Sequence, residues 1–142
     1  MKKGQADKAL ADFNKAIATN PKYHDAYYNR GNIYMGKGQY DAAIADFSRA
    51  IAVNPKFAEA YNNRGNTYRR KEEYELAISD FNKALEINPQ YIDAYFNKAG
   101  ASESAGQKAE AIEAYKAFIQ HAPAQRAAHI ELAKQKINKL EQ

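Results

Sequence analysis

The sequence predicts an all-α protein, a solenoid in which helix-turn-helix repeats stack one upon the next. Three observations predict this fold. The only prolines, at positions 21, 55, 89 and 123, lie 34 residues apart each time. Between them, apolar residues recur three or four positions apart, which is the period of one helix face. Seven glycines and four prolines in 142 residues are too few for the turns of a β-sandwich or barrel.

Each 34-residue period is predicted to hold two helices. In the first full period, residues 25–36 form the first helix, which a Gly-Lys-Gly turn ends. Residues 40–53 form the second, which ends before Pro55 because a residue that precedes proline is driven out of the α region. The same division predicts three full repeats, at residues 24–57, 58–91 and 92–123.

The two ends differ from these repeats, within one domain predicted over residues 1–142 with about eight helices. Residues 124–142 should form a capping helix, whose apolar stripe is Ala127, Ile130, Ala133, Ile137 and Leu140. Residues 4–20 match only the second helix of a repeat, so apolar surface should be exposed there. That surface predicts pairing with another copy, a place in a longer array, or a tolerated frayed end. Its residues are Ala9, Phe13 and Ile17.

Opposite charges recur three positions apart on the second helices, as at Asp46 and Arg49 or Asp80 and Lys83. Such pairs support a helix on its solvent side. We therefore expect these aspartates to be exposed.

The aligned positions resemble the tetratricopeptide repeat family, whose 34-residue motif has an aromatic residue, Leu-Gly, Tyr, Ala-x3-Phe and Pro at fixed spacing. In the first full repeat they are Tyr27, Arg30, Gly31, Tyr34, Ala43, Phe47 and Pro55. The small Gly31 and Ala43 should let two helices approach closely, while aromatic side chains fill the space between neighbours. Arginine replaces the usual leucine, so we expect that position to be more exposed. The resemblance implies a right-handed stack in which the first helix of every repeat lines a concave groove.

Several function classes lack their motifs. With no cysteine, and with histidines only at 24, 121 and 129, the chain has no zinc motif, phosphate loop or nucleophile elbow. We expect no catalytic residue, metal or cofactor. The sequence has no apolar run of membrane-spanning length and no signal peptide, which predicts a cytoplasmic protein. The net charge of +4 combines 21 basic with 17 acidic residues, so charge alone selects no partner.

The groove should be lined by the face of the first helices that the repeat motif leaves free. Counted round the helices, that face holds Asp25, Tyr28, Asn29, Asn32, Glu59, Asn62, Asn63, Asn66, Arg70, Asp93, Phe96 and Asn97.

Asparagine is frequent on this face although it is a poor helix former. A carboxamide matches the hydrogen-bonding edge of a peptide unit, so Asn29, Asn63 and Asn97 could form a ladder that holds an extended peptide by its backbone. Rungs about 10 Å apart would meet every third residue of such a peptide. In the alternative, these side chains tie neighbouring helices together. Asn63→Ala separates the two, because a ladder predicts weaker binding and a tie predicts lower stability.

One subtype of ligand is not expected. Family members that grip the C-terminal carboxylate of heat-shock chaperones do so with three cations and two asparagines. Here Asn32 and Asn63 match, but Tyr28, Asp93 and Asn97 stand where the cations would be, and a carboxylate would be poorly held without them. The acidic residues Asp25, Glu59 and Asp93 begin successive first helices, which favours the helix dipoles or a preference for basic partners.

The leading interpretation is therefore a non-catalytic scaffold that binds a protein or peptide in its groove. Two alternatives remain open. Helical repeats can bind single-stranded RNA, although the acidic row would repel phosphates. The repeats could also self-assemble end to end, with the groove incidental.

Overall fold

The computed structural model describes residues 2–142, so residue 1 of the predicted domain lies outside it. These residues form eight α-helices and one 3-10 turn, with no strand. The elements are α1 (Lys3–Thr19), α2 (His24–Gly36), α3 (Tyr40–Val53), α4 (Ala58–Arg70), α5 (Tyr74–Ile87), α6 (Ile92–Ser104), α7 (Lys108–His121), η1 (Ala124–Arg126) and α8 (Ala127–Glu141). The prediction of an all-α fold with about eight helices is confirmed.

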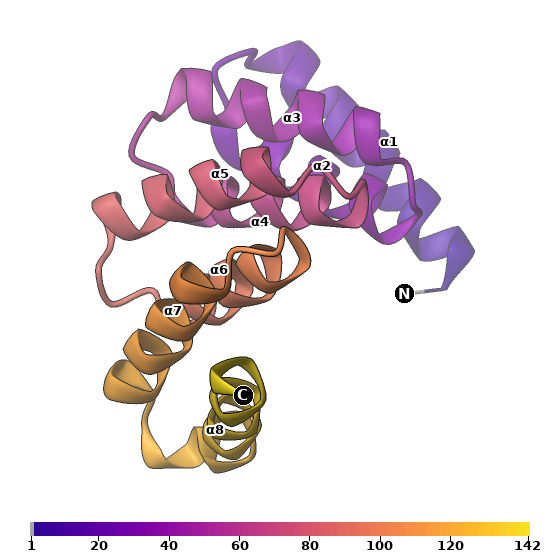
Figure 1. Cartoon of the computed structure of the whole chain (residues 1–142). Helices are drawn as coiled ribbons and strands as arrows, with labels where there is room; N and C mark the ends of the chain where they lie inside the picture. Colours follow the sequence, from indigo (N-terminus) through magenta and orange to yellow (C-terminus); the bar gives the residue numbers. More distant parts are fainter. Residues whose placement is uncertain (1) are drawn as a thin grey trace.

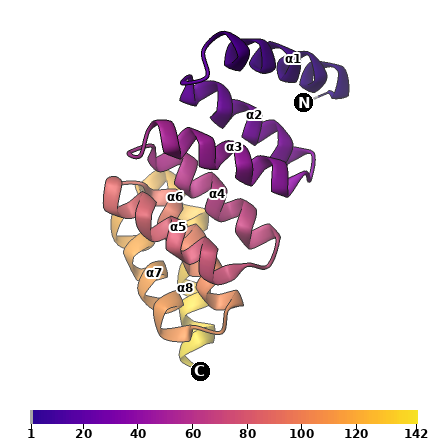
Figure 2. The same cartoon turned by 90° about the horizontal axis from the view of Figure 1, so that it is seen from above.

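The helices stack in chain order. Each helix packs against the next, and α4 also touches both α2 and α6. The two ends of the chain therefore lie at opposite ends of the stack, with α1 at one end and α8 at the other (Figure 2). Successive helices are rotated relative to one another, so the stack is curved. Helix α8 lies at the end of this curve, beyond α6 and α7 (Figure 1). This arrangement is the predicted α-solenoid. The division into repeats at 24–57, 58–91 and 92–123 stays a prediction.

The turns repeat with the same period as the prolines. Within each helical pair, the turn has one residue in the left-handed region: Gly38 at φ 75°, Glu72 at φ 62° and Gly106 at φ 76°. Between pairs, an asparagine follows the last residue of the helix. Its side-chain oxygen accepts a hydrogen bond from the backbone N–H two residues later, as Asn54 Oδ1 does from Lys56 at 3.3 Å. Glycine tolerates a positive φ, and an asparagine side chain can close a turn on its own backbone. These residues therefore end the helices.

The closest approach of two helices occurs where the sequence places glycine opposite phenylalanine. A Cβ atom built on Gly31 would lie 2.8 Å from the Phe47 ring, and one built on Gly65 would lie 2.8 Å from the Phe81 ring. Both rings are fully buried, as is Ala43 beside the first. The steric role predicted for Gly31 and Ala43 fits these contacts, because any side chain at the glycine would displace the ring.

The charged residues of the helices do not lie as predicted. Asp46 is 4% exposed and receives two hydrogen bonds of 2.7 Å from Arg30, on the first helix of its own pair. Asp80 is held in the same way by Arg64 at 2.8 Å. The prediction of exposed aspartates was therefore wrong for Asp46 and Asp80, while the arginines are partly exposed, at 20% and 19% of the side chain. A bidentate pair between two helices satisfies the carboxylate better than an exposed neighbour three positions away.

Each of these arginines also lies between aromatic rings. The Arg64 guanidinium is 5.5 Å from the centroid of the Tyr61 ring and 5.9 Å from that of Tyr68. Its remaining nitrogen donates to Ser48 of the preceding pair at 3.0 Å. The carboxylate of Asp80 raises the Arg64 pKa chiefly through the hydrogen bond, despite burial. An arginine in this position thus joins two successive repeats as a leucine could not.

The last helix covers the end of the core. Ala133 and Ile137 are buried against Ala99, Tyr115 and Phe118, and Ile130 and Leu140 are half-buried there. Ala127 is exposed, so the predicted apolar stripe is one residue too long. Ala127 is the first residue of α8 and directly follows the 3-10 turn.

Candidate functional site

The asparagine-rich face encloses a hollow of about 420 Å³ between α4, α6 and the start of α8. Six of its lining residues were predicted from the sequence: Asn62, Asn63, Asn66, Asp93, Phe96 and Asn97. Four were not: Tyr91, Phe118, Arg126 and His129. The structure therefore brings together half of the predicted groove residues.

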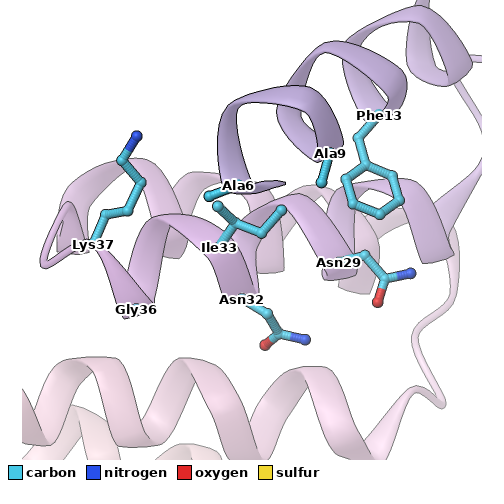
Figure 3. Close-up of a pocket in the computed structure, with 8 residues that line it drawn as sticks. All are labelled: Ala6, Ala9, Phe13, Asn29, Asn32, Ile33, Gly36 and Lys37. Carbon is cyan, nitrogen blue, oxygen red and sulfur yellow. The ribbon is translucent and has the colours of Figure 1, made fainter. Parts of the chain in front are cut away.

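A second hollow, of about 440 Å³, lies between α1 and α2. It takes Asn29 and Asn32 from the predicted groove and Ala9 and Phe13 from the predicted self-association surface (Figure 3). Ile17, the third residue of that surface, instead packs with Tyr27, Ala50 and Ala60. Self-association through α1 stays a prediction.

The other predicted residues lie outside both hollows. The Tyr28 ring packs against the rings of Phe47 and Phe57, with centroids 6.0 Å and 4.8 Å away. Glu59 and Arg70 are exposed, and Asp25 lies 3.5 Å from the His24 imidazole. None of the three lines the groove hollow.

The asparagines form a hydrogen-bonded network across the repeats. Asn63 Nδ2 donates to Tyr28 at 3.1 Å and to Asn32 at 2.8 Å, and Asn63 Oδ1 accepts from Asn62 at 3.2 Å. Asn97 Nδ2 donates to Asn62 Oδ1 at 3.1 Å. Both N–H groups of Asn63 are thus used within the stack. This network favours the alternative in which these side chains tie neighbouring helices together.

One groove amide is less well satisfied. Among residues 2–142, the side-chain oxygen of Asn66 is buried and has no hydrogen-bond partner. A buried acceptor without a donor has an unfavourable free energy. A ligand N–H group that reached it would relieve that cost.

Charges in the groove are largely compensated. Asp93 pairs with Arg126 at 2.8 Å, so one residue of the predicted acidic row is neutralised by the chain itself. Burial raises the pKa of the Tyr91 hydroxyl, helped by acidic neighbours, so the ring is neutral at physiological pH. The hollow therefore presents amides and aromatic rings with no strong excess charge.

The four lining residues that sequence reasoning missed come from outside the first helices. Tyr91 precedes α6, and aromatic residues recur at the same place before α2 and α4, as Tyr23 and Phe57. That recurrence could have found it. Arg126 and His129 depend on how the last helix crosses the stack, which the repeat pattern does not specify.

Two further observations apply to residues 2–142 alone. No helix there is both long and apolar enough to cross a bilayer. No three histidine, aspartate or glutamate side chains in that range are grouped so that they could hold a metal ion.

Three solved structures similar to this chain share its helical stack. A crystal structure of MamA protein has a TM-score of 0.82 at 28% identity, covering 98% of this chain and 79% of that one. The TPR2B domain of yeast Sti1 in complex with pHsp70 has 0.77 at 25%, covering 83% and 95%. The first TPR of Spaghetti (RPAP3), bound to the HSP90 peptide SRMEEVD, has 0.75 at 24%, covering 83% and 90%.

Family models give the clearest assignment, while a comparison with curated proteins finds no match. A tetratricopeptide repeat model matches residues 28–92, another matches residues 81–113, and a TPR repeat model matches residues 1–38. Together they extend from residue 1 to residue 113, with the motif residues and the helical stack in agreement. The chain belongs to the tetratricopeptide repeat family.

Proposed function

We propose that this protein is a non-catalytic interaction scaffold whose concave groove binds an extended segment of a partner protein. The observation that carries the proposal is the hollow between α4, α6 and α8, which gathers amides and aromatic rings from separate helices. Of the similar structures, the RPAP3 domain is bound to an HSP90 peptide, and the yeast Sti1 domain is in complex with pHsp70. A shared fold with such domains supports a peptide or protein partner here.

The groove of this chain suits the backbone of a peptide better than a terminal carboxylate. Of the residues that line the hollow, Arg126 is the only arginine or lysine, and it is already paired with Asp93. Amide groups recognise peptide N–H and C=O groups without regard to the side chains that the peptide carries. We therefore propose that the groove binds the backbone of an extended peptide and does not hold a C-terminal carboxylate.

The network changes which asparagines we assign to the ligand. Asn63 has both of its donors engaged in the stack, so we assign it to holding the helices together. Asn66 has a buried oxygen without a donor, and Asn97 uses only its Nδ2 group in the asparagine network. These two side chains are the proposed rungs, with Phe96 beside them as an apolar contact.

The test begins with a phage-displayed library of random 12-residue peptides, selected on the purified protein. The affinity of the best peptide is then measured by calorimetry for wild type and for Asn66→Ala. We expect binding about five- to tenfold weaker, because a hydrogen bond to the ligand is lost. Stability should stay equal or rise, because the variant no longer buries an unsatisfied oxygen.

Asn63→Ala is the matched control. It removes three hydrogen bonds within the stack, so we expect it to lower the free energy of unfolding by about 1–3 kcal/mol. N-methylation of single peptide bonds in the ligand tests backbone recognition, since it removes the N–H and keeps every side chain. Unchanged affinity for all N-methylated ligands, or for Asn66→Ala, would contradict the proposal. Selective binding of single-stranded RNA with a steep salt dependence would favour the alternative function.

A further inference from the structure

Helix α1 repeats the residues of α3 and α5 but not their burial. Ala9, Asp12 and Phe13 lie 34 positions before Ala43, Asp46 and Phe47. In α3 these three residues are 0%, 4% and 0% exposed. In α1 the aspartate is exposed, and the alanine and phenylalanine are only half-buried. The same surface is thus covered in α3 and open in α1.

In the next two pairs, α2–α3 and α4–α5, an arginine followed by glycine covers this surface. Arg30 pairs with Asp46, and Gly31 lies against the Phe47 ring. Arg64 pairs with Asp80 and Gly65 lies against Phe81 in the same way. The stack therefore shows twice that an Arg-Gly pair on a neighbouring helix fits against an Ala-x2-Asp-Phe surface.

The open surface forms one wall of the hollow in Figure 3, opposite Asn29, Asn32 and Ile33 of α2. Phe13 projects from α1 toward this space. No ion pair within 4.0 Å involves Asp12 among residues 2–142, in contrast to Asp46 and Asp80. The hollow thus has an apolar floor that includes Phe13, and the residue before Phe13, Asp12, has a carboxylate without an ion pair in the described part of the chain.

Asn29 adds a third point of recognition. Its counterparts Asn63 and Asn97 each donate a hydrogen bond to the preceding first helix. The acceptor for Asn97 is Asn62, two positions before Arg64. Asn29 lines the hollow and has no corresponding acceptor within residues 2–142.

We infer that this face of α1 and α2 is a docking site for an α-helix of a partner protein that carries Asn-x-Arg-Gly. Its arginine pairs with Asp12, its glycine lies against Phe13, and its asparagine accepts from Asn29. A second folded copy does not supply such a helix, because Arg30 and Arg64 are held by their own aspartates, with side chains 20% and 19% exposed. This surface is separate from the groove proposed above.

The probe is an acetylated, amidated peptide with the sequence of residues 57–71, which contains Asn62, Arg64 and Gly65 in this register. It is titrated into the isotope-labelled full chain and followed by amide NMR shifts. We expect shifts to centre on Ala9, Phe13 and Asn29 and to leave the groove around Asn97 unchanged. Shifts centred on the groove would overturn the inference.

Substitutions on both partners sharpen the test. Asp12→Asn should weaken binding about tenfold, since it removes a bidentate charge-assisted pair. Glu75→Gln changes the net charge equally at an exposed site on α5 and should leave affinity within about twofold. With Asp12→Asn protein, Arg64→Gln in the peptide should cause little further loss, because the two changes remove one interaction.

A peptide with Gly65→Leu separates specific from non-specific binding, because the two predict changes in affinity in opposite directions. Leucine raises both helix propensity and hydrophobicity, so any non-specific helix binding would strengthen. At the proposed site there is no room for it against Phe13, and affinity should fall about tenfold. Stronger binding of this peptide, or equal binding to wild type and Asp12→Asn, would overturn the inference.

A covalent version removes dependence on peptide helicity. Residues 57–73 joined directly before Ala6 place the helix and its turn in the register of α4 and α5. We expect a higher melting temperature than for the original chain, and loss of most of the gain when the added arginine is replaced by glutamine. No gain would overturn the inference. So would concentration-dependent dimerisation of the original chain that Phe13→Glu abolishes, because a second copy would then be the occupant.

Discussion

Gly65 and Gly100 both lie on first helices, but their surroundings differ, because only Gly65 occupies the motif position of Gly31. A Cβ on Gly65 would meet the buried Phe81 ring at 2.8 Å, whereas one on Gly100 would meet only Nη1 of Arg69, at 3.1 Å. A ring packed in the core cannot move aside without disturbing its neighbours, but the end of an arginine can.

We therefore expect Gly65→Ala and Gly100→Ala to change stability in opposite directions. Gly65→Ala should lower the free energy of unfolding by about 1–3 kcal/mol through overpacking. Gly100→Ala should be neutral or raise it by up to about 1 kcal/mol, because alanine favours the helix. Urea unfolding of both variants measures this difference. Equal effects would show that the Phe81 ring adapts to the added methyl group.

Residue patterns predicted packing better than they predicted polar contacts. The recurrence of Gly31, Ala43 and Phe47 every 34 positions sufficed to predict close helix pairs, because a steric fit depends on size at fixed spacing. The partner of Asp46 was mistaken because Arg49 is near in sequence, while Arg30 is brought near only by folding. The function of Asn63 was open for the same reason, since an amide serves equally to bind a ligand or a neighbouring helix.

At the scale of elements, α8 is joined to the stack by a polar contact as well as by its apolar stripe. Glu103 of α6 accepts a hydrogen bond from Lys136 of α8 at 3.0 Å and from the Tyr115 hydroxyl of α7 at 2.8 Å. Burial alone would raise the Glu103 pKa, but the bonds from Lys136 and Tyr115 outweigh it and lower the pKa below 4.5. The ionised carboxylate therefore holds three helices together.

This contact should make the docking of α8 sensitive to acid. A carboxylate with a lowered pKa in the folded state stabilises that state above its unfolded pKa, and the contribution disappears as the pH falls through the folded value. Glu103→Gln should lower the free energy of unfolding by about 1 kcal/mol at pH 7, since both charged partners are partly exposed. Urea unfolding at pH 7 and at pH 3 should show a smaller loss at the lower pH, because the carboxylate is protonated as the pH falls.

Glu110→Gln provides the control, because Glu110 is an exposed glutamate of α7 and has no ion pair among the described residues. Its effect should stay within about 0.5 kcal/mol at both pH values, as for an exposed surface change. If Glu103→Gln were equally destabilising at both pH values, its cost would come from altered packing instead of the ionised contact.

For the whole molecule, a stack in which each helix touches chiefly its neighbours should not unfold uniformly. The contacts of α1 are with α2, whereas α3 is packed between α2 and α4. In such a one-dimensional array, stability is the sum of local terms and terms between neighbours, so an end helix opens at lower free energy than a central one. The period made this architecture predictable, and the match of residues 4–20 to only one helix of a repeat predicted the unequal burial of aligned residues.

The pair Phe13 and Phe47 tests that inequality, because the two residues occupy the same position of successive second helices. Phe47 is fully buried, so Phe47→Ala should lower the free energy of unfolding by about 3–5 kcal/mol and weaken protection across α2 to α5. Phe13 is half-buried at the hollow of Figure 3, so Phe13→Ala should cost less than about 2 kcal/mol. Hydrogen exchange of backbone amides should place its effect in α1 and the adjoining part of α2. Equal loss of protection in α5 for both variants would mean that the stack unfolds as one cooperative unit, in which the end helix is as firmly held as the centre.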